Sequence, residues 1–360
     1  MIHPPNPIMR LFFSLVLLVA GFQFVGCSEP SSPEPSRKAS PQKLYYFTWS
    51  DYVDSKIMAD FEASRGVQVV VDTFSSNEEL LAKIQTRMTG YDVVVPSDFM
   101  AGIMGRLGLL AELDLSRIPN VQELEKHLAQ LPFDPTQKFS IPYLWGTVGI
   151  GYNAKVILEA PTTWNVLWDP EYSGRISMLN DQREVFGLAL RTLGYSLNSR
   201  DRQAIQEAKD RLINQKPLVK VYTSEQFDQL LVSGDVVLAH AWGGPVARAM
   251  REDSSIRYAI PEEGGTIWAD CMAVLATSKN KMLAMDFINY LLSEKVALQT
   301  SQRLLFASAN RHVRHQLPPE IRNNIAVYPP DEVLSRMEWM EDVQEAIREY
   351  DRAWTELKVH

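Results

Sequence analysis

The sequence predicts an α/β protein with two lobes, and three observations carry this prediction. The chain has 360 residues, 46% of them hydrophobic, which is enough to build two ordinary domains with cores of their own. Strand-like and helix-like runs alternate from Lys43 onward. The connections between these runs are short, and short crossovers favour a parallel sheet with helices on its faces.

The first 27 residues have the pattern of an export signal. Arg10 precedes an uncharged run over 11–26 that is too short to span a bilayer comfortably. The run ends in FVGC, which is similar to a bacterial lipoprotein signal, although Phe24 stands where an aliphatic residue is usual. We therefore expect a signal peptide over 1–26 and lipid attachment at Cys27. A buried N-terminal helix is the alternative, but the run has no polar face; Met9 is a second candidate start.

Residues 27–42 are expected to form a tether. Nine of the fifteen residues from Ser28 to Gln42 are Ser or Pro, and the segment has no apolar periodicity. A flexible chain of this length reaches about 20 Å, enough to hold a folded body just off a membrane. The sequence therefore predicts a protein that works outside the cytoplasm, anchored to the membrane by its lipid.

The folded body begins with the order βαβαβ. We expect strands over 44–48, 67–73 and 91–96, and helices over 53–64 and 77–87. Ser76 and Glu79 have capping-box spacing, and Gly66 and Gly90 stand where helices would end.

A second group of elements follows this opening unit. Strands are expected over 148–152, 175–179, 236–241, 256–260 and 267–276, and helices over 184–193, 202–213 and 224–233. The last third is expected to be mainly helical, over 281–301 and 337–357.

Charge and motif content exclude several classes of protein. The formal net charge is −8, with no basic patch, so nucleic acid is not expected as a partner. The two cysteines match no metal spacing, and nucleophile-elbow, zincin, P-loop and dinucleotide motifs are absent from the sequence. His312 and His315 alternate with arginines, which oppose a divalent metal. We expect no metal, no cofactor and no catalytic residues.

Two further residues are expected to be structural. His240 lies within an apolar strand-like run, which favours a hydrogen-bonded histidine of the core or of a pocket wall. Cys271 is expected to be a small buried hydrophobic residue.

Four short segments combine aromatic with acidic or polar side chains, each at the edge of a predicted strand or helix, where α/β folds bind ligands. They contain Trp49, Ser50, Asp51 and Tyr52; Ser97, Asp98 and Phe99; Asp181 and Glu184; and Trp268 and Asp270. The spacing of Asp181 and Glu184 places both on one helix face, and that of Trp268 and Asp270 aims both to one side of a strand. Trp242 adds an indole at the end of the strand over 236–241.

Carboxylates beside indoles match a flexible alkylammonium ligand. Carboxylates pair with its charges, and each indole face attracts a cation by about 0.5–2 kcal/mol. An anionic ligand would require an arginine fork, and Arg183, the only arginine nearby, is expected to point away from Asp181 and Glu184.

Other interpretations of these residues stay open. Tryptophans often only fill cores, and Asp181 alone is typical of a helix N-cap. Two other functions are possible for the four segments together: a site for a different organic cation, or a secreted hydrolase that uses Asp181 and Glu184 as an acid–base pair.

Several stretches resemble the polyamine-binding, or spermidine/putrescine-binding, proteins of ABC importers. They are LYYFTWSDYV (44–53), YDVVVPSDF (91–99), FSIPYLWGTVGIGYN (139–153), NDQREVFGLALRTLGY (180–195), AWGGPVARA (241–249) and PEEGGTIWADCMAV (261–274). The resemblance implies a type II periplasmic binding protein fold, with the ligand cleft between a lobe of 43–147 and 271–315 and a lobe of 148–270 and 316–360. It also implies a monomer that is not an enzyme and works with an ABC permease and its ATPase.

The resemblance also implies a role for each site residue. Trp49 and Tyr52 would flank one end of the polyamine, with Ser50 and Asp51 at its terminal ammonium; Asp181 and Glu184 would bind the other end, Asp270 a central ammonium, and Trp242 and Trp268 would form the walls. Phe99 and Phe306 stand where the family has tyrosine, and Met340 where it has glutamine. The pattern favours spermidine, with putrescine tolerated.

Overall fold

The computed structural model describes residues 41–86 and 90–360. The predicted signal peptide, Cys27 and almost all of the tether lie outside these ranges. The strands are β1 Gln42–Trp49, β2 Val67–Phe74, β3 Val93–Val94, β4 Ser140–Asn153, β5 Ile176–Met178, β6 Val219–Tyr222, β7 Leu238–Trp242, β8 Ile256–Ala259, β9 Thr266–Val274, β10 Ala307–Ser308 and β11 Glu338–Trp339. The main helices are α1 Ser55–Arg65, α2 Asn77–Gln85, α3 Asp98–Arg106, α4 Gln182–Thr192, α5 Arg202–Gln215, α6 Phe227–Ser233, α7 Gly243–Glu252, α8 Lys281–Leu291, α9 Glu294–Leu304 and α12 Ile347–Val359, with the short helices α10 Pro319–Arg322 and α11 Asp331–Leu334.

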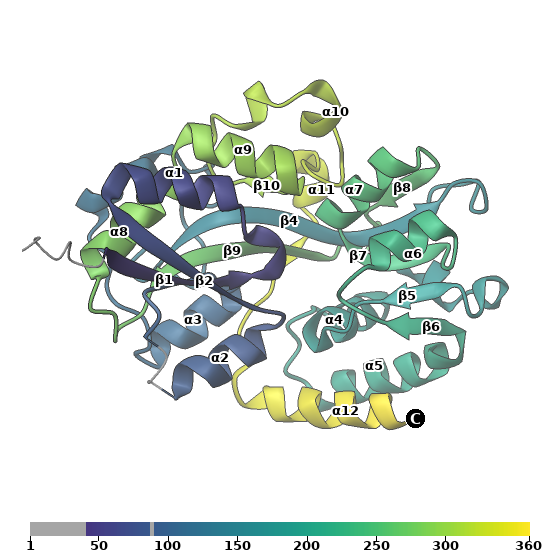
Figure 1. Cartoon of the computed structure of the whole chain (residues 1–360). Helices are drawn as coiled ribbons and strands as arrows, with labels where there is room; N and C mark the ends of the chain where they lie inside the picture. Colours follow the sequence, from purple (N-terminus) through teal and green to yellow (C-terminus); the bar gives the residue numbers. More distant parts are fainter. Residues whose placement is uncertain (1–40, 87–89) are drawn as a thin grey trace, which may run out of the picture. The chain divides into compact units, whose positions relative to one another are not determined.

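The described strands join into one sheet, in which eight follow the order β2-β1-β3-β9-β4-β7-β5-β6. The other three lie off this path, since β8 and β10 pair with β4 and β11 pairs with β9. The long strands β4 and β9 pair in the middle of this order and run side by side through the folded body (Figure 1). Two of the three predicted lobe boundaries fall inside these strands, at 147/148 in β4 and 270/271 in β9, and the third, 315/316, falls in a short 3-10 helix. The sheet therefore continues from one half to the other, and the division into those lobes stays a prediction.

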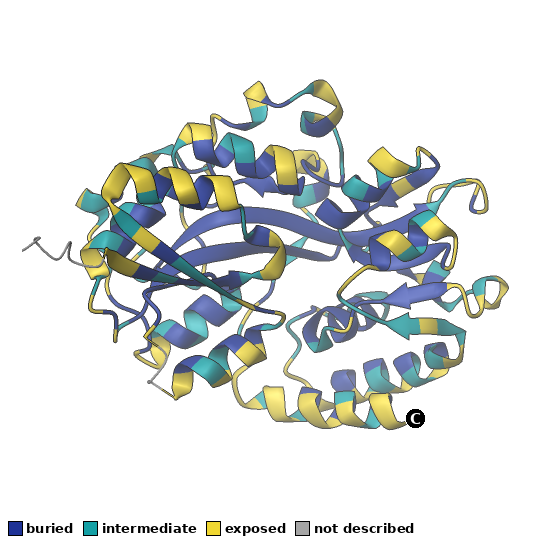
Figure 2. Cartoon of the chain, viewed as in Figure 1, coloured by how far each residue is buried: buried dark blue, intermediate teal, exposed yellow. Residues whose placement is uncertain are grey.

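The opening βαβαβ unit is parallel, as predicted: β1 pairs in parallel with β2 and with β3. The sheet as a whole is mixed, because β3 pairs with β9, β9 with β4, and β4 with β7 in antiparallel fashion. The largely hydrophobic sequences of β4 and β9 agree with their position, because both strands are buried on both faces of the sheet. Every residue of β9, and all of β4 except Asn153, is buried, as the dark ribbons of Figure 2 show.

Local capping explains where the first helices begin and end. The Asp54 carboxylate accepts from the backbone N–H groups of Lys56 and Ile57, and α1 ends at Gly66 with φ +64°. Ser76 caps α2 by accepting from Glu79 N, as predicted. In a capping box the Glu79 carboxylate would also accept from the backbone N–H of Ser76. Here it accepts from the backbone N–H and the hydroxyl of Ser75 instead.

Two helical predictions near the C-terminus are wrong. The segment 281–301 is not one helix, because α8 ends at Leu291 and α9 begins at Glu294. The expected helix over 337–357 begins only at Ile347, because Glu338–Trp339 pairs in parallel with β9 as β11. This pairing joins residues about seventy positions apart in sequence, so local periodicity does not indicate it. The structure adds α3, α7 and β6, which were not predicted.

No helix in 41–86 or 90–360 is both long and apolar enough to cross a membrane. Over the same residues, no group of three or more His, Cys, Asp or Glu side chains is arranged to hold a metal ion. Cys271 is fully buried, as predicted.

His240 lies on β7 and is fully buried, but the prediction that it is hydrogen-bonded is wrong. Neither ring nitrogen has a hydrogen-bond partner among the described residues, and the ring packs edge-on against Trp164 at 5.6 Å between centroids. Burial lowers the pKa of His240 to about 3, so the imidazole is neutral in the folded protein.

Replacing His240 with leucine is expected to make the protein less sensitive to acid. The folded-state pKa of His240 lies below its ordinary 6.5, so this residue makes an unfavourable contribution to the stability of the wild type that grows as the pH falls below 6.5. The leucine variant lacks this contribution, which amounts to about 2 kcal/mol at pH 5. Urea unfolding at pH 7 and pH 5 measures it, with exposed His315→Leu as the control. Equal losses of stability in wild type and His240→Leu would contradict the assignment.

Candidate functional site

The site is arranged along β9, which presents Thr266, Trp268 and Asp270 on one side of the sheet because alternate side chains of a strand point the same way. Thr266 donates a hydrogen bond to Glu184 of α4 at 2.7 Å. Four residues further along, Asp270 contacts groups from the opening βαβαβ unit. One strand therefore links the two acidic segments that the sequence predicted to act together.

Asp270 is held by two hydroxyl groups. The Tyr52 hydroxyl donates to Oδ2, and the Ser97 hydroxyl donates to Oδ1 at 2.9 Å. Asn77 fixes Ser97 by donating to its hydroxyl and accepting from its backbone N–H, both at 3.1 Å. The Asp270 residue is only 6% exposed, and burial raises its pKa to about 6, against the opposing effect of Tyr52, Ser97 and the Trp49 indole.

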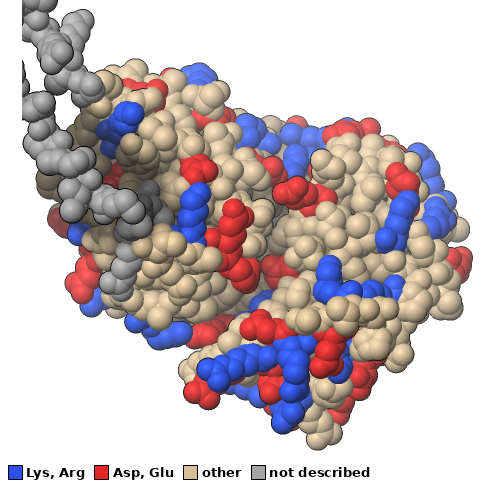
Figure 3. Space-filling model, turned by 60° about the horizontal axis from the view of Figure 1, so that its bottom comes forward, with Lys and Arg blue, Asp and Glu red and all other residues tan. Residues whose placement is uncertain are grey.

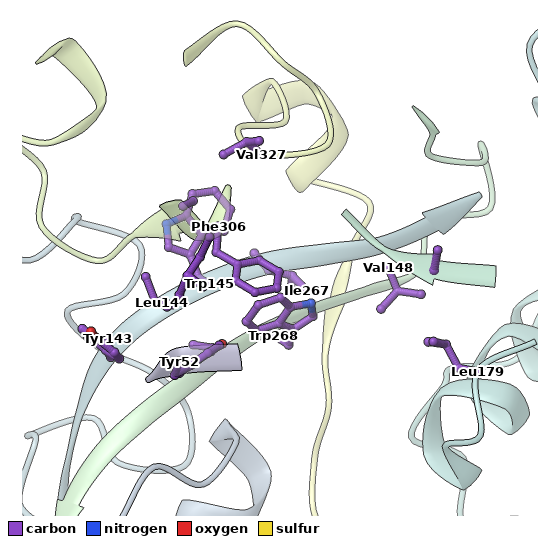
Figure 4. Packing of buried hydrophobic residues seen from close by; sticks show 14 of the residues in the cluster. Tyr52, Tyr143, Leu144, Trp145, Val148, Leu179, Ile267, Trp268, Phe306 and Val327 are labelled. Carbon is purple, nitrogen blue, oxygen red and sulfur yellow. The ribbon is translucent and has the colours of Figure 1, made fainter. Parts of the chain in front are cut away.

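Aromatic rings surround this carboxyl group. Phe306 packs edge-on against Trp268 at 5.3 Å and against Tyr52 at 6.0 Å between centroids, and Figure 4 shows these three rings together. The indole N–H groups of Trp49 and Trp268 are buried, and neither makes a hydrogen bond of ordinary geometry within the described residues. The rings thus form apolar walls beside the charged group.

Asp98 lies beside the part of β9 that carries Trp268 and Asp270. Its carboxylate begins α3 and accepts from the backbone N–H of Phe99 at 2.7 Å and of Ala269 at 3.3 Å. Ala269 separates Trp268 from Asp270, so Asp98 ties α3 to the part of β9 that carries the site. Burial, aided by the charge of Asp270, raises the pKa of Asp98 to about 8.

Asp181 and Glu184 form the second acidic group. Asp181 is the N-cap of α4 and accepts from Glu184 N at 3.0 Å, so its capping role, left open by the sequence, is present. Burial and the charge of Asp181 raise the pKa of Glu184 to about 8, and Asp98 adds to this effect. Burial raises the pKa of Asp181 as well.

Arg183 lies among these carboxyl groups without pairing with them. Its guanidinium donates to the Glu341 carbonyl at 3.0 Å and to Asn198 Oδ1 at 3.1 Å, and it lies over the Tyr350 ring at 5.2 Å. It forms no ion pair with Asp181 or Glu184, which agrees with the prediction that it points away from them.

The segment Ser50–Tyr52 is a single 3-10 turn after β1, labelled η1, in which Ser50 and Asp51 are exposed. The Asp51 carboxylate forms an ion pair with Arg248 of α7 at 3.2 Å. Arg248 also donates to the Leu304 carbonyl at 3.2 Å, so it bridges α7 to α9. Because Asp51 already has a cationic partner, its predicted contact with a ligand ammonium would have to compete with Arg248.

The remaining predicted residues lie around this core. Phe99 and Met340 line a cavity of about 360 Å³ with Phe133 and Trp339, beside a larger one of about 610 Å³ lined by Trp339, Glu341 and residues near 198. Asp270, Glu184 and Trp268 line neither cavity, since they are enclosed. Trp242 precedes α7 and packs against Phe227 at 6.1 Å.

Three contributors were missed by the sequence: Asn77, Thr266 and Arg248. Thr266 had a signal, because it shares the strand face of Trp268 and Asp270. No local pattern in the sequence indicated Asn77 or Arg248, since the residue that each of them contacts, Ser97 and Asp51, is at least twenty positions away.

The fold and the site define an extracytoplasmic binding protein. The sequence matches the family of bacterial extracellular solute-binding proteins over residues 56–327, and the chain belongs to this family. It has the two-lobed α/β fold of periplasmic binding proteins, as predicted. The family binds solutes, so the hydrolase alternative is set aside.

Individual relatives cover almost the whole chain. The spermidine/putrescine-binding periplasmic protein 1 of Haemophilus influenzae is 33% identical over 351 residues, covering 95% of this chain and 98% of its own. The structure of the spermidine/putrescine ABC transporter substrate-binding protein of Streptococcus pneumoniae has a TM-score of 0.78 and 34% identity, covering 88% of this chain and 99% of its own. A lipoprotein of Treponema pallidum gives a TM-score of 0.81 at 29% identity, covering 89% of this chain and 100% of its own.

Proposed function

We propose that this protein captures polyamines outside the cytoplasm and delivers them to an ABC importer. One observation carries the proposal: the buried carboxyl groups of Asp98, Glu184 and Asp270 and the half-buried one of Asp181 lie along β9 and at the start of α4, and none forms an ion pair with a described residue. Buried charges are normally paired, so this arrangement calls for a cationic partner. Aromatic walls beside the carboxylates suit the methylene chain between ammonium groups.

The relatives support this ligand class. Those from Haemophilus influenzae and Streptococcus pneumoniae are named for spermidine and putrescine, and the second is named as part of an ABC transporter. We infer that spermidine is preferred and putrescine tolerated. Phe99, Phe306 and Met340 stand where the family has hydrogen-bonding side chains, so recognition depends more on the carboxylates of the site, those of Asp181 and Glu184 among them.

We also propose a lipid anchor at Cys27, after removal of residues 1–26, with the tether holding a monomeric binding domain near the membrane. The sequence pattern supports this anchor, as does the naming of the Treponema pallidum relative as a lipoprotein. Nucleic acid is not proposed as a partner. Figure 3 shows acidic and basic side chains intermixed over the face that it presents, unlike the basic surface that binds phosphates.

Spermidine and putrescine are expected to raise the melting temperature of the purified protein. A ligand that binds only the folded state stabilises it by about 2.7 kcal/mol at a hundred times Kd. Differential scanning fluorimetry with each amine measures the shift, and 1,4-butanediol, which has the chain of putrescine without its charges, is the control. A shift with another organic cation but none with millimolar polyamine would replace the proposed ligand class.

A further inference from the structure

The four carboxyl groups of the site form a continuous electrostatic series. Asp270 and Asp98 are linked through β9, because Asp98 accepts from the backbone N–H of Ala269. The negative charge of Asp98 also acts on Glu184, which follows Asp181 by three residues on α4. A change of charge at one end of the series is therefore felt at the other.

Arg183 is the only described cationic side chain that acts on this series from within the site, and its hydrogen bonds go elsewhere. With every carboxyl group ionised, the four carboxylates and one guanidinium have a formal charge of −3. The titratable groups that face Asp98 are Asp270 and Cys271 on β9, and Arg183 and Glu184 on α4. Tyr52 and Tyr46 face Asp270 from η1 and β1.

Such a charge is not retained in a buried site without compensation. Ionised groups that share a low-dielectric environment take up protons instead. Asp98 is 1% exposed, with Asp270 as a like-charged neighbour and only two backbone N–H groups as partners. The ligand-free protein therefore holds at least one proton at neutral pH, because burial raises the pKa of both Asp98 and Glu184 to about 8.

We propose that the site keeps its charge balanced by releasing a proton when it binds a ligand of higher charge. Asp98 is the residue that loses this proton on binding and regains it when the ligand leaves. A trication brings one more positive charge than a dication, so its binding expels one more proton from the site. The same enclosed site then accepts ligands of different charge, because a bound proton supplies the positive charge that the dication lacks relative to the trication. This inference rests on the proposed polyamine function and extends it to the way in which the site accepts both ligands.

The exchange has a measurable pH dependence. Between pH 6 and 7.5 ordinary amines keep their charge, so the ligands do not change while Asp98 remains largely protonated in the free protein. Binding of a trication then releases about one proton more than binding of a dication, so its affinity increases more steeply as the pH rises. The ratio of the putrescine Kd to the spermidine Kd is expected to increase about 25-fold over this range.

Isothermal titration calorimetry tests the proposal on the full protein. Titrations at pH 7 in phosphate and in imidazole, whose ionisation enthalpies differ, give the number of protons released by each ligand. We expect spermidine to release about one proton more than putrescine. Equal proton numbers for two ligands that both bind would overturn this inference alone, whereas failure of both to bind would overturn the proposed function.

A variant assigns the proton to its residue. Asp98→Asn cannot titrate, so the difference in proton release should disappear and the ratio of the two Kd values should stop changing with pH. Asp235→Asn is the matched control, because Asp235 is exposed and pairs with Lys220 at 2.7 Å. A pH dependence that persists in folded Asp98→Asn would refute the role of Asp98. The wild-type titrations decide the exchange itself even if this variant does not fold.

Discussion

Replacing Asp270 with asparagine is expected to weaken spermidine binding by at least tenfold, and by about a hundredfold if its ammonium partner is fully enclosed. The side chain is buried and held by Tyr52 and Ser97, so no other described carboxylate can take the same position without moving β9. The amide keeps the size of the carboxylate but loses its charge, so a buried ammonium group is left without its partner.

The same substitution is not expected to destabilise the ligand-free protein at neutral pH. The pKa of Asp270 rises from its ordinary 3.8 to about 6 in the folded state, so the folded wild type loses stability as the pH rises through this range. The loss, about 3 kcal/mol, is absent from the asparagine variant. The free energies of unfolding of wild type and variant should therefore differ most above pH 6, and the difference should disappear below pH 3.8.

Asp134→Asn is the matched control for this prediction. Asp134 is also a buried carboxylate, but it accepts from the backbone N–H groups of Lys138, Phe139 and Ser140, none of which is a predicted site residue. We expect Asp134→Asn to lower the urea midpoint and leave the spermidine Kd unchanged, the reverse of Asp270→Asn. Calorimetry and urea unfolding of both variants give the comparison, and an unchanged Kd in Asp270→Asn would remove Asp270 from the site.

The largest loss of stability is expected from Gly264→Ala. Gly264 has φ +79°, and an added Cβ would lie against the backbone carbonyl oxygen of Arg336, closer than real Cβ atoms approach. The left-handed conformation costs about 1–2 kcal/mol and the overlap about 1–3 more. Gly264 lies immediately before β9, and Arg336 shortly before β11, so relief of the overlap would separate the two segments that carry Thr266 and Met340.

Gly174→Ala separates the two causes. Gly174 has φ +71°, but an added Cβ there would meet nothing within 4 Å, so only the conformational cost applies. We expect a loss of about 1–2 kcal/mol for Gly174→Ala and of about 2–5 kcal/mol for Gly264→Ala in urea unfolding. Similar losses in the two variants would show that the contact with Arg336 is relieved easily.

Much of the fold follows from local sequence. The opening βαβαβ unit was predicted because its strand and helix periods alternate and because Gly66 and Ser76 mark helix ends within their own segments. The helix predicted over 337–357 failed because the backbone of Glu338–Trp339 pairs with β9. The acidic, aromatic composition of this segment suits a helix, so its periodicity could not reveal a strand formed by a distant partner.

The candidate site, too, was predicted in part from local spacing and in part is seen only in the folded chain. Strand and helix spacing placed Trp268 with Asp270 and Asp181 with Glu184, and the structure keeps both pairs together. Only the folded chain shows that Asp51 is paired with Arg248. That partner lies 197 residues away, and such a separation leaves no trace in local spacing.

The sequence by itself determined the class of this protein: the alternating elements, the export pattern and the carboxylates beside indoles, all of which depend on residues close together in the chain. The tertiary structure decided how those carboxylates are charged. Asp98 was predicted only as one more polar residue at a strand end, and its pKa is raised because folding buries it beside Asp270 and Glu184. Burial and the approach of like charges depend on residues far apart in sequence, so they exist only once the chain has folded.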